Sequence, residues 1–96
     1  MPTYEVTNRF RKDFEALSPD RKAEFRRAID RFRDDLASGR PFRKGLRVKR
    51  IRGTNVFEMT WAPDGRATFE YGREIINNEP HVIWRRIGTH EVFGAS

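Results

Sequence analysis

The clearest structural signal in the chain is residues 57–71, FEMTWAPDGRATFEY. Apolar and polar residues alternate on both sides of Pro63-Asp64-Gly65, and a period of two is typical of a strand with one buried face. Asp-Gly is a strong turn signal, and a turn this short joins antiparallel neighbours. These residues therefore predict a β-hairpin. Phe69 and Tyr71 share one face of its second strand, and we expect both rings in the core.

Further strands are predicted on both sides of this hairpin. Residues 46–52 alternate in character and end at the turn Gly53-Thr54-Asn55, and a last strand spans residues 81–87 after a polar loop. Residues 4–6 alternate as well and predict a short first strand. Histidine has only an intermediate tendency to be buried, so we expect His81 on the surface.

Two helices are predicted between the first strand and the rest of the sheet. In residues 8–17, phenylalanine and leucine recur at i, i+4 and i+7, and Asn8 can cap this helix. Ser18 is a good N-cap for the second helix, with Pro19 at its first position. Gly39 follows the last residue of the helical pattern and is expected to end it.

The second helix keeps an apolar face of helical period, and Arg31 and Asp35 form an i,i+4 pair on its exposed side. Because the join between the helices is very short, we expect an antiparallel helical hairpin. The order is strand, helix, helix and four strands, which is an α+β fold with one domain over residues 1–96. The hairpin must cover one face of a mainly antiparallel sheet, and the other face is expected to be open to solvent.

Composition narrows the classes of function. The chain has 96 residues and no cysteine, which excludes disulfides and thiolate metal sites. It has no apolar run long enough for a signal peptide or a membrane span, so we expect a cytoplasmic protein without a membrane partner.

The chain is basic overall. Lys and Arg total 20 against 14 Asp and Glu, which gives a net charge of +6, and most of the basic residues are arginines. Arginine suits phosphate recognition, but GC-rich codon usage explains the same excess equally well.

The basic residues cluster in the middle of the chain. Residues 40–52, here named the basic segment, hold seven Lys and Arg residues and no acidic residue. Such a run is typically a solvated patch and often a binding surface. Both a nucleic acid and an acidic protein partner fit this description.

The end of the chain carries a second signal. Residues 84–93 read WRRIGTHEVF, and the strand-like alternation stops at Gly88, just before His90. Histidine is the side chain that readily exchanges a proton near neutral pH, and the nearby Arg85 and Arg86 attract anions. The stretch therefore indicates phosphate chemistry or phosphate binding. A histidine that only closes the strand through a hydrogen bond fits the same pattern.

The order of elements and several motifs resemble the RelE/ParE superfamily of bacterial toxin–antitoxin systems, over nearly the whole chain. The motifs are the first strand with its helical hairpin, the basic strand that ends in Gly53, Arg66 just after the hairpin turn, and the last strand with its histidine and aromatic residue. No single motif is specific, and the ordered set at this length carries the resemblance.

The resemblance implies several functions. RelE-like members enter the ribosomal A site and cut mRNA without a metal or other cofactor, using the 2′-hydroxyl of the mRNA to attack the adjacent phosphate. ParE-like members inhibit DNA gyrase instead. Both are silenced by a cognate antitoxin, and a toxin–antitoxin hetero-oligomer on operator DNA is one implied assembly. We favour an mRNA endonuclease that inhibits translation, with a gyrase inhibitor and an inert RNA-binding homologue as alternatives.

The resemblance also implies roles for single residues. Cleavage needs proton transfer and stabilisation of charge on the phosphate. We expect His90 to transfer a proton, Arg66 to hold the phosphate and Glu58 to act as a general base, unless Glu58 and Arg66 only pair with each other. Phe93 stands near where RelE-like members commonly have a tyrosine, so it can stack on a base but carries no proton. The residues expected to bind RNA are Arg47, Lys49, Arg50, Arg52, Arg86 and Phe93.

Overall fold

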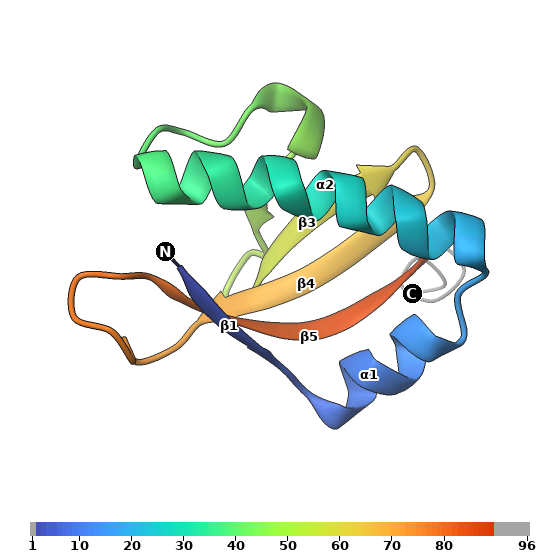
Figure 1. Ribbon diagram of the computed structural model, residues 1–96, viewed down its shortest axis with the longest axis horizontal. Coiled ribbons are helices and arrows are strands. Elements are labelled where there is room, and N and C mark those ends of the chain that lie inside the picture. The colour runs from blue at the N-terminus through green and yellow to red at the C-terminus, as the bar shows by residue number, and fades with distance from the viewer. Residues whose placement is uncertain (1, 90–96) are drawn as a thin grey trace.

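The computed structural model describes residues 2–89 and has the expected order of elements (Figure 1). Two helices follow a short first strand, and a single-turn 3₁₀ helix precedes the other four strands. The elements are β1 (Thr3–Val6), α1 (Asn8–Glu15), α2 (Pro19–Ser38), the 3₁₀ helix η1 (Lys44–Leu46), β2 (Lys49–Arg50), β3 (Phe57–Ala62), β4 (Gly65–Tyr71) and β5 (His81–Thr89).

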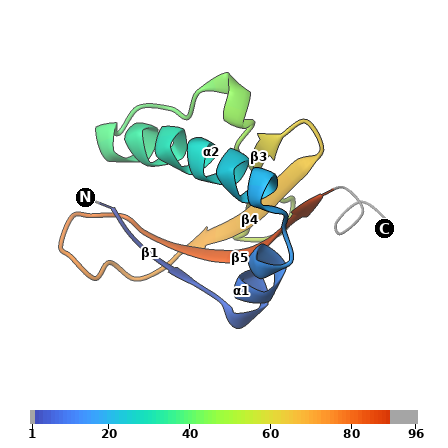
Figure 2. The same ribbon diagram turned by 45° about the vertical axis from the view of Figure 1, so that its right-hand side comes forward.

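The strands form one sheet in the order β1-β5-β4-β3-β2. β1 runs parallel to β5, whereas the β2–β3, β3–β4 and β4–β5 pairs are antiparallel. Both helices lie on the same face of this sheet, as Figures 1 and 2 show. The predicted α+β class, with two helices on one face of a mainly antiparallel sheet, is therefore confirmed.

Short polar side chains fix where the helices begin. Thr7 Oγ1 accepts a hydrogen bond from a backbone N–H one turn ahead at 3.0 Å, so Thr7 caps α1. The expected cap at Asn8 is wrong, because Asn8 is already the first helical residue. Ser18 caps α2 as predicted and is followed by Pro19. Gly39 ends α2 with φ 73°, a left-handed conformation that favours glycine.

The core between the helices and the sheet is built around Trp84 of β5. Its ring centroid lies 6.1 Å from that of Phe10 in α1 and 5.8 Å from that of Phe25 in α2. Phe32 of α2 and Phe69 of β4 lie at 5.2 and 5.1 Å. One aromatic cluster thus joins both helices to the centre of the sheet, as the helical spacing of the phenylalanines predicted.

The basic strand expected over residues 46–52 is reduced to the two residues of β2. Leu46 is 1% exposed and lies at the end of η1, because its side chain is buried in the core. Arg47 then has φ 47°, a left-handed conformation outside the strand region. Arg47 therefore lies before the strand, and only Lys49 and Arg50 of the expected residues form it.

His81 and Tyr71 also differ from expectation. His81 is buried, with 3% of its surface exposed, and its ring contacts two side chains of β1. Nδ1 lies 2.7 Å from Oγ1 of Thr3, and Nε2 lies 2.8 Å from Oε1 of Glu5. These two partners satisfy the buried ring. Tyr71, at the end of β4, is 44% exposed, although its ring contacts Phe69 edge-on.

Gly65, the first residue of β4, is predicted to tolerate no side chain. A Cβ on Gly65 would lie 2.5 Å from Trp61 Cε2, and the Trp61 ring is itself buried and cannot move aside freely. Gly65→Ala should lower the free energy of unfolding by about 1–3 kcal/mol through overpacking, measured by urea denaturation. Gly45→Ala is the control, because a Cβ there meets no atom within 4 Å. Equal losses in the two variants would contradict this packing.

Candidate functional site

The sheet face opposite the helices carries a row of polar side chains from four strands. The register aligns Lys49 of β2 with Glu58 of β3, and Glu58 in turn with Thr68 of β4. Thr68 aligns with Arg86 of β5. Aligned residues point to the same side of a sheet, and so does Arg66, two residues before Thr68. We name this surface the polar face and define it by Lys49, Glu58, Arg66, Thr68 and Arg86.

Glu58 lies at the centre of the polar face between two cations. Its Oε1 is 3.8 Å from Lys49 Nζ and 3.9 Å from Arg66 Nε. The Lys49 side chain is 73% exposed, whereas those of Glu58 and Arg66 are only 22% and 16% exposed. Water and salt therefore screen the Glu58–Arg66 pair less than the Glu58–Lys49 pair. The pairing of Glu58 with Arg66, which the sequence left open, is present.

Arg66 is also held by the hairpin turn that precedes it. Its Nη1 donates hydrogen bonds to the backbone carbonyls of Ala62 and Pro63 at 3.3 Å and to that of Gly65 at 2.9 Å. The guanidinium is thus fixed at one end of the polar face by backbone oxygens on one side and by Glu58 on the other. This arrangement orients a cation, and it also stabilises the turn.

A β-bulge separates the two arginines of β5. Thr68 aligns with Arg86 whereas Phe69 aligns with Trp84, so Arg85 has no aligned partner on β4. The bulge allows Trp84 to enter the core while Arg86, two residues later, lies on the other face. A strict alternation would have put both residues on the same face, so the sequence pattern alone does not give this arrangement.

Arg86 is bound by an acidic residue of α1. Its Nε lies 3.2 Å from Asp13 Oδ2, and the same oxygen accepts a hydrogen bond from the backbone N–H of Ile87 at 3.3 Å. Asp13 therefore ties α1 to β5 beyond the end of β1. Arg85 lies 3.2 Å from Glu70 on β4. Sequence reasoning did not find Asp13, because nothing in the helical pattern marks a contact with a residue so distant in sequence.

The basic segment is anchored to α2 by Asp35. Arg43 donates three hydrogen bonds of 2.9 Å to this carboxylate, from its backbone N–H, Nε and Nη2. The predicted i,i+4 pair of Asp35 with Arg31 is therefore wrong, and Asp35 is 5% exposed rather than on the exposed side. The hydrogen bonds from Arg43 lower the pKa of Asp35 to about 2, and the same contacts raise the pKa of Arg43.

The other cations of the basic segment are not all on the polar face. Lys49 belongs to it, but Arg50 aligns with Phe57, whose ring stacks on Phe69 on the side of the core. Arg47 follows η1, and Arg52 lies in the turn between β2 and β3. Of the basic segment, the structure thus brings only Lys49 to the Glu58–Arg66 pair. Arg47, Arg50 and Arg52 add positive charge to the surface outside the polar face.

Two of the expected site residues, His90 and Phe93, lie outside the described residues. The described part of β5 ends at Thr89, which aligns with Gly65 at the start of β4. Arg66 aligns with Gly88. In the sequence, His90 is therefore two positions after Gly88, the residue that lies beside Arg66.

Two features are absent from the part of the chain that the structure describes. Within residues 2–89, no group of three or more His, Cys, Asp or Glu side chains is arranged to hold a metal ion. Over the same range, no helix has both the length and the apolar character that crossing a bilayer requires.

No protein-family model matches the sequence, and no curated protein matches it either. Solved structures do match the fold. YafQ from E. coli has a TM-score of 0.67 and 12% identity, over 97% of this chain and 98% of that one. A metal-bound toxin from Helicobacter pylori has a TM-score of 0.64 and 18% identity, over 96% and 98%. A chain of the intact E. coli RelBE toxin–antitoxin complex has a TM-score of 0.62 and 13% identity, over 93% and 96%. The chain therefore has the fold that the sequence resemblance predicted.

Asp35 predicts a pH dependence of stability. Because its folded pKa of about 2 is below the ordinary value, the ionised group stabilises the fold above about pH 4, and this contribution is lost as the pH falls toward 2. Asp35→Asn should have a lower urea midpoint than the wild type at pH 7, and the gap should shrink between about pH 4 and 2. The exposed neighbour change Asp34→Asn is the control, with little effect at pH 7. A gap that is constant over this range would contradict the Asp35–Arg43 assignment.

Proposed function

We propose that the chain is the toxin of a bacterial toxin–antitoxin pair and cuts mRNA on the ribosome. One observation carries the proposal: the polar face holds Lys49, Glu58 and Arg66 together beside the strand that leads into His90. The fold, shared with YafQ and with a chain of the RelBE complex, supports it. The proposed partners are a cognate antitoxin, the ribosome and mRNA, with a toxin–antitoxin complex on operator DNA, all in the cytoplasm.

The proposed reaction uses the RNA's own nucleophile. The 2′-oxygen attacks the adjacent phosphorus, the bond from phosphorus to the 5′-oxygen breaks, and a cyclic phosphate forms. A base removes the 2′-proton and an acid protonates the leaving 5′-oxygen, so protons balance. In this scheme His90 transfers a proton and Arg66 stabilises the charge that builds on the phosphate.

Glu58 has two candidate roles in this scheme. Its carboxylate lies between Lys49 and Arg66, which suits a general base within reach of a phosphate held by those cations. The same position suits a group that only holds the two cations in place. Glu58→Gln separates the roles, because the amide still accepts a hydrogen bond from Arg66 but removes no proton.

RNA binding in this proposal combines a local and a general part. Lys49 contacts the RNA backbone at the polar face, and Arg47, Arg50 and Arg52 supply the surrounding positive field. Phe93 stacks on a base. Arg86 acts from the position fixed by Asp13, so its contribution is a stationary charge at the edge of the polar face rather than a mobile contact. No cofactor is required.

A second candidate function is RNA binding without cleavage. Nη1 of Arg66 already donates to three backbone carbonyls, as expected of an arginine that stabilises a turn. Phe93 carries no proton to transfer. A binder of this kind blocks its target by occupancy, as a gyrase inhibitor of the same fold would do, and needs no residue with the role of His90.

Expression of single variants separates these functions. His90→Ala and Arg66→Ala should each lower cleavage of translated mRNA by about 10²–10⁴-fold, since each removes a positioned catalytic group. Cut sites would be mapped by primer extension after induction, with DNA supercoiling followed in parallel. Arg73→Ala, an exposed loop arginine, is the control and should cut like the wild type.

Three other outcomes would contradict the nuclease. Intact mRNA with growth arrest and altered supercoiling would indicate gyrase inhibition. Intact mRNA with unimpaired growth would indicate an inert homologue. Cleavage that persists in His90→Ala would remove the proposed proton-transfer group and refute the mechanism as written.

A further inference from the structure

The hairpin turn between β3 and β4 is contacted from both sides of the sheet. It comprises residues 62–65 and lies beside the N-terminal half of α2 (Figures 1 and 2). From the polar face, Nη1 of Arg66 donates hydrogen bonds to the backbone carbonyls of Ala62, Pro63 and Gly65. The position of the Arg66 guanidinium therefore depends on the conformation of the turn.

From the helical side, Arg21 of α2 holds the tip of the same turn. Its Nη2 donates a hydrogen bond to Oδ2 of Asp64 at 2.5 Å, and its Nη1 donates one to Oε1 of Glu24 at 3.1 Å. The central carbon of its guanidinium lies 5.7 Å from the centroid of the Trp61 ring. Two carboxylates and one aromatic ring thus orient the planar guanidinium, an arrangement that a lysine ammonium does not reproduce.

Trp61 gives the turn a second contact with α2. A β-bulge at Trp61 leaves it without an aligned residue on β4, and it is only 4% exposed. Gly65 lies so close to the indole that a Cβ on it would be 2.5 Å from Cε2 of Trp61. Phe25 of α2 meets the same indole edge-on, with ring centroids 6.1 Å apart. The turn thus packs on a buried ring that α2 also contacts.

The Arg21–Asp64 pair acts on position more than on the stability of the fold. The two side chains are 31% and 47% exposed, and ion pairs with this exposure add little to folding stability. The pair joins the tip of a short turn to a long helix, however, and so limits where the tip lies. Any displacement of the turn also displaces the three carbonyls that hold Arg66.

We propose that Arg21 is a positioning residue for Arg66. It holds the hairpin turn from the helical side, and the backbone of the turn orients the Arg66 guanidinium on the polar face. Arg21 lies on the other side of the sheet from Glu58, so it does not contact RNA in this scheme. The consequence for cleavage rests on the proposed function, because a displaced Arg66 stabilises the charge on the phosphate less well.

Single-turnover cleavage of mRNA on programmed ribosomes measures this consequence. Arg21→Gln should lower the maximal rate on the order of tenfold, because it removes a partly exposed ion pair and a cation–π contact. The protein concentration that gives half of the maximal rate should not change. Arg21→Lys should lose less, because its ammonium still reaches Asp64. In an Arg66→Ala background, Arg21→Gln should cause no further loss, since both changes disturb one group.

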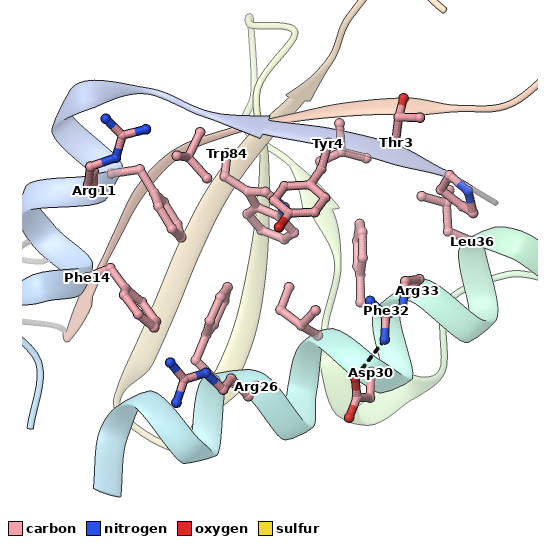
Figure 3. A pocket seen from close by; sticks show the side chains of 16 residues that line it. Thr3, Tyr4, Arg11, Phe14, Arg26, Asp30, Phe32, Arg33, Leu36 and Trp84 are labelled. Atoms are coloured by element: carbon pink, nitrogen blue, oxygen red, sulfur yellow. Dashed lines mark hydrogen bonds and ion pairs between the residues drawn. The ribbon is translucent and has the colours of Figure 1, made fainter. Parts of the chain in front are cut away.

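The matched control is Arg33→Gln. Arg33 also belongs to α2 and also pairs with an acidic residue three positions away, with its Nη2 2.9 Å from Oδ1 of Asp30. It lines a groove of about 580 Å³ between α2 and β1, together with Ile29 and Leu36 and away from the hairpin turn (Figure 3). This variant should cut like the wild type. Urea denaturation checks that each variant folds.

A second measurement requires no cleavage. Exchange of the Arg66 Nε–H with water is followed by ¹H–¹⁵N NMR on the free protein. Exchange should be faster in Arg21→Gln than in the wild type, because the turn that holds the guanidinium opens more often. In Arg33→Gln it should keep the wild-type rate.

Three results would overturn the inference. One is a wild-type maximal rate or unchanged Arg66 exchange in Arg21→Gln. Another is a raised half-saturating concentration at an unchanged maximal rate, which would make Arg21 a contact to the ribosome. The third is an equal further loss in the Arg66→Ala background, which would show that Arg21 acts on another group. If the wild type cuts nothing, the nuclease is refuted, and the exchange of Arg66 still decides whether Arg21 positions it.

Discussion

The rest of the structure depends on the packing of Trp84 against rings from both helices and from β4. This cluster buries one face of the sheet in the core. Because successive strand residues point to opposite faces, the polar residues between the core positions point to the other face of the sheet. Glu58 and Arg66 meet there because Met59 and Ala67 are buried beneath the helices. The candidate site is thus a consequence of core packing and register.

The same packing leaves part of the helical side uncovered. α1 is too short to run the length of β5, and β1 extends the sheet at its edge without covering its surface. The molecule therefore has two surfaces with different chemistry. The polar face is charged and holds its groups in fixed contacts, whereas the groove beside α2 is lined mainly by apolar side chains. The hairpin turn joins the two sides of the sheet, because Arg21 contacts it from the helical side and Arg66 contacts it from the polar face.

Local sequence patterns predicted where the helices and strands lie. Contacts between residues far apart in the sequence determine the features that those patterns did not predict. The hairpin over residues 57–71 and the ends of α2 follow from period, turn and capping signals, which involve only neighbours in sequence. His81 is buried because Thr3 and Glu5 lie beside it through the parallel β1–β5 pair, a contact that no local signal shows. The bulge at Arg85 likewise places Arg86 on the polar face while Trp84 enters the core. The residues expected at the site were thus identifiable by type, but their grouping required the register.

In the proposed function, RNA binds the polar face and leaves the helical side of the sheet free. The most direct measurement is an NMR titration of the full chain with a 2′-O-methyl RNA oligonucleotide, which has no 2′-hydroxyl and cannot be cut. Backbone amide shifts should change at Lys49, Glu58 and Arg66, whereas those of Ile29 and Leu36 should stay the same. Shifts concentrated along the α2 groove, with none at Glu58 and Arg66, would contradict this placement of the RNA.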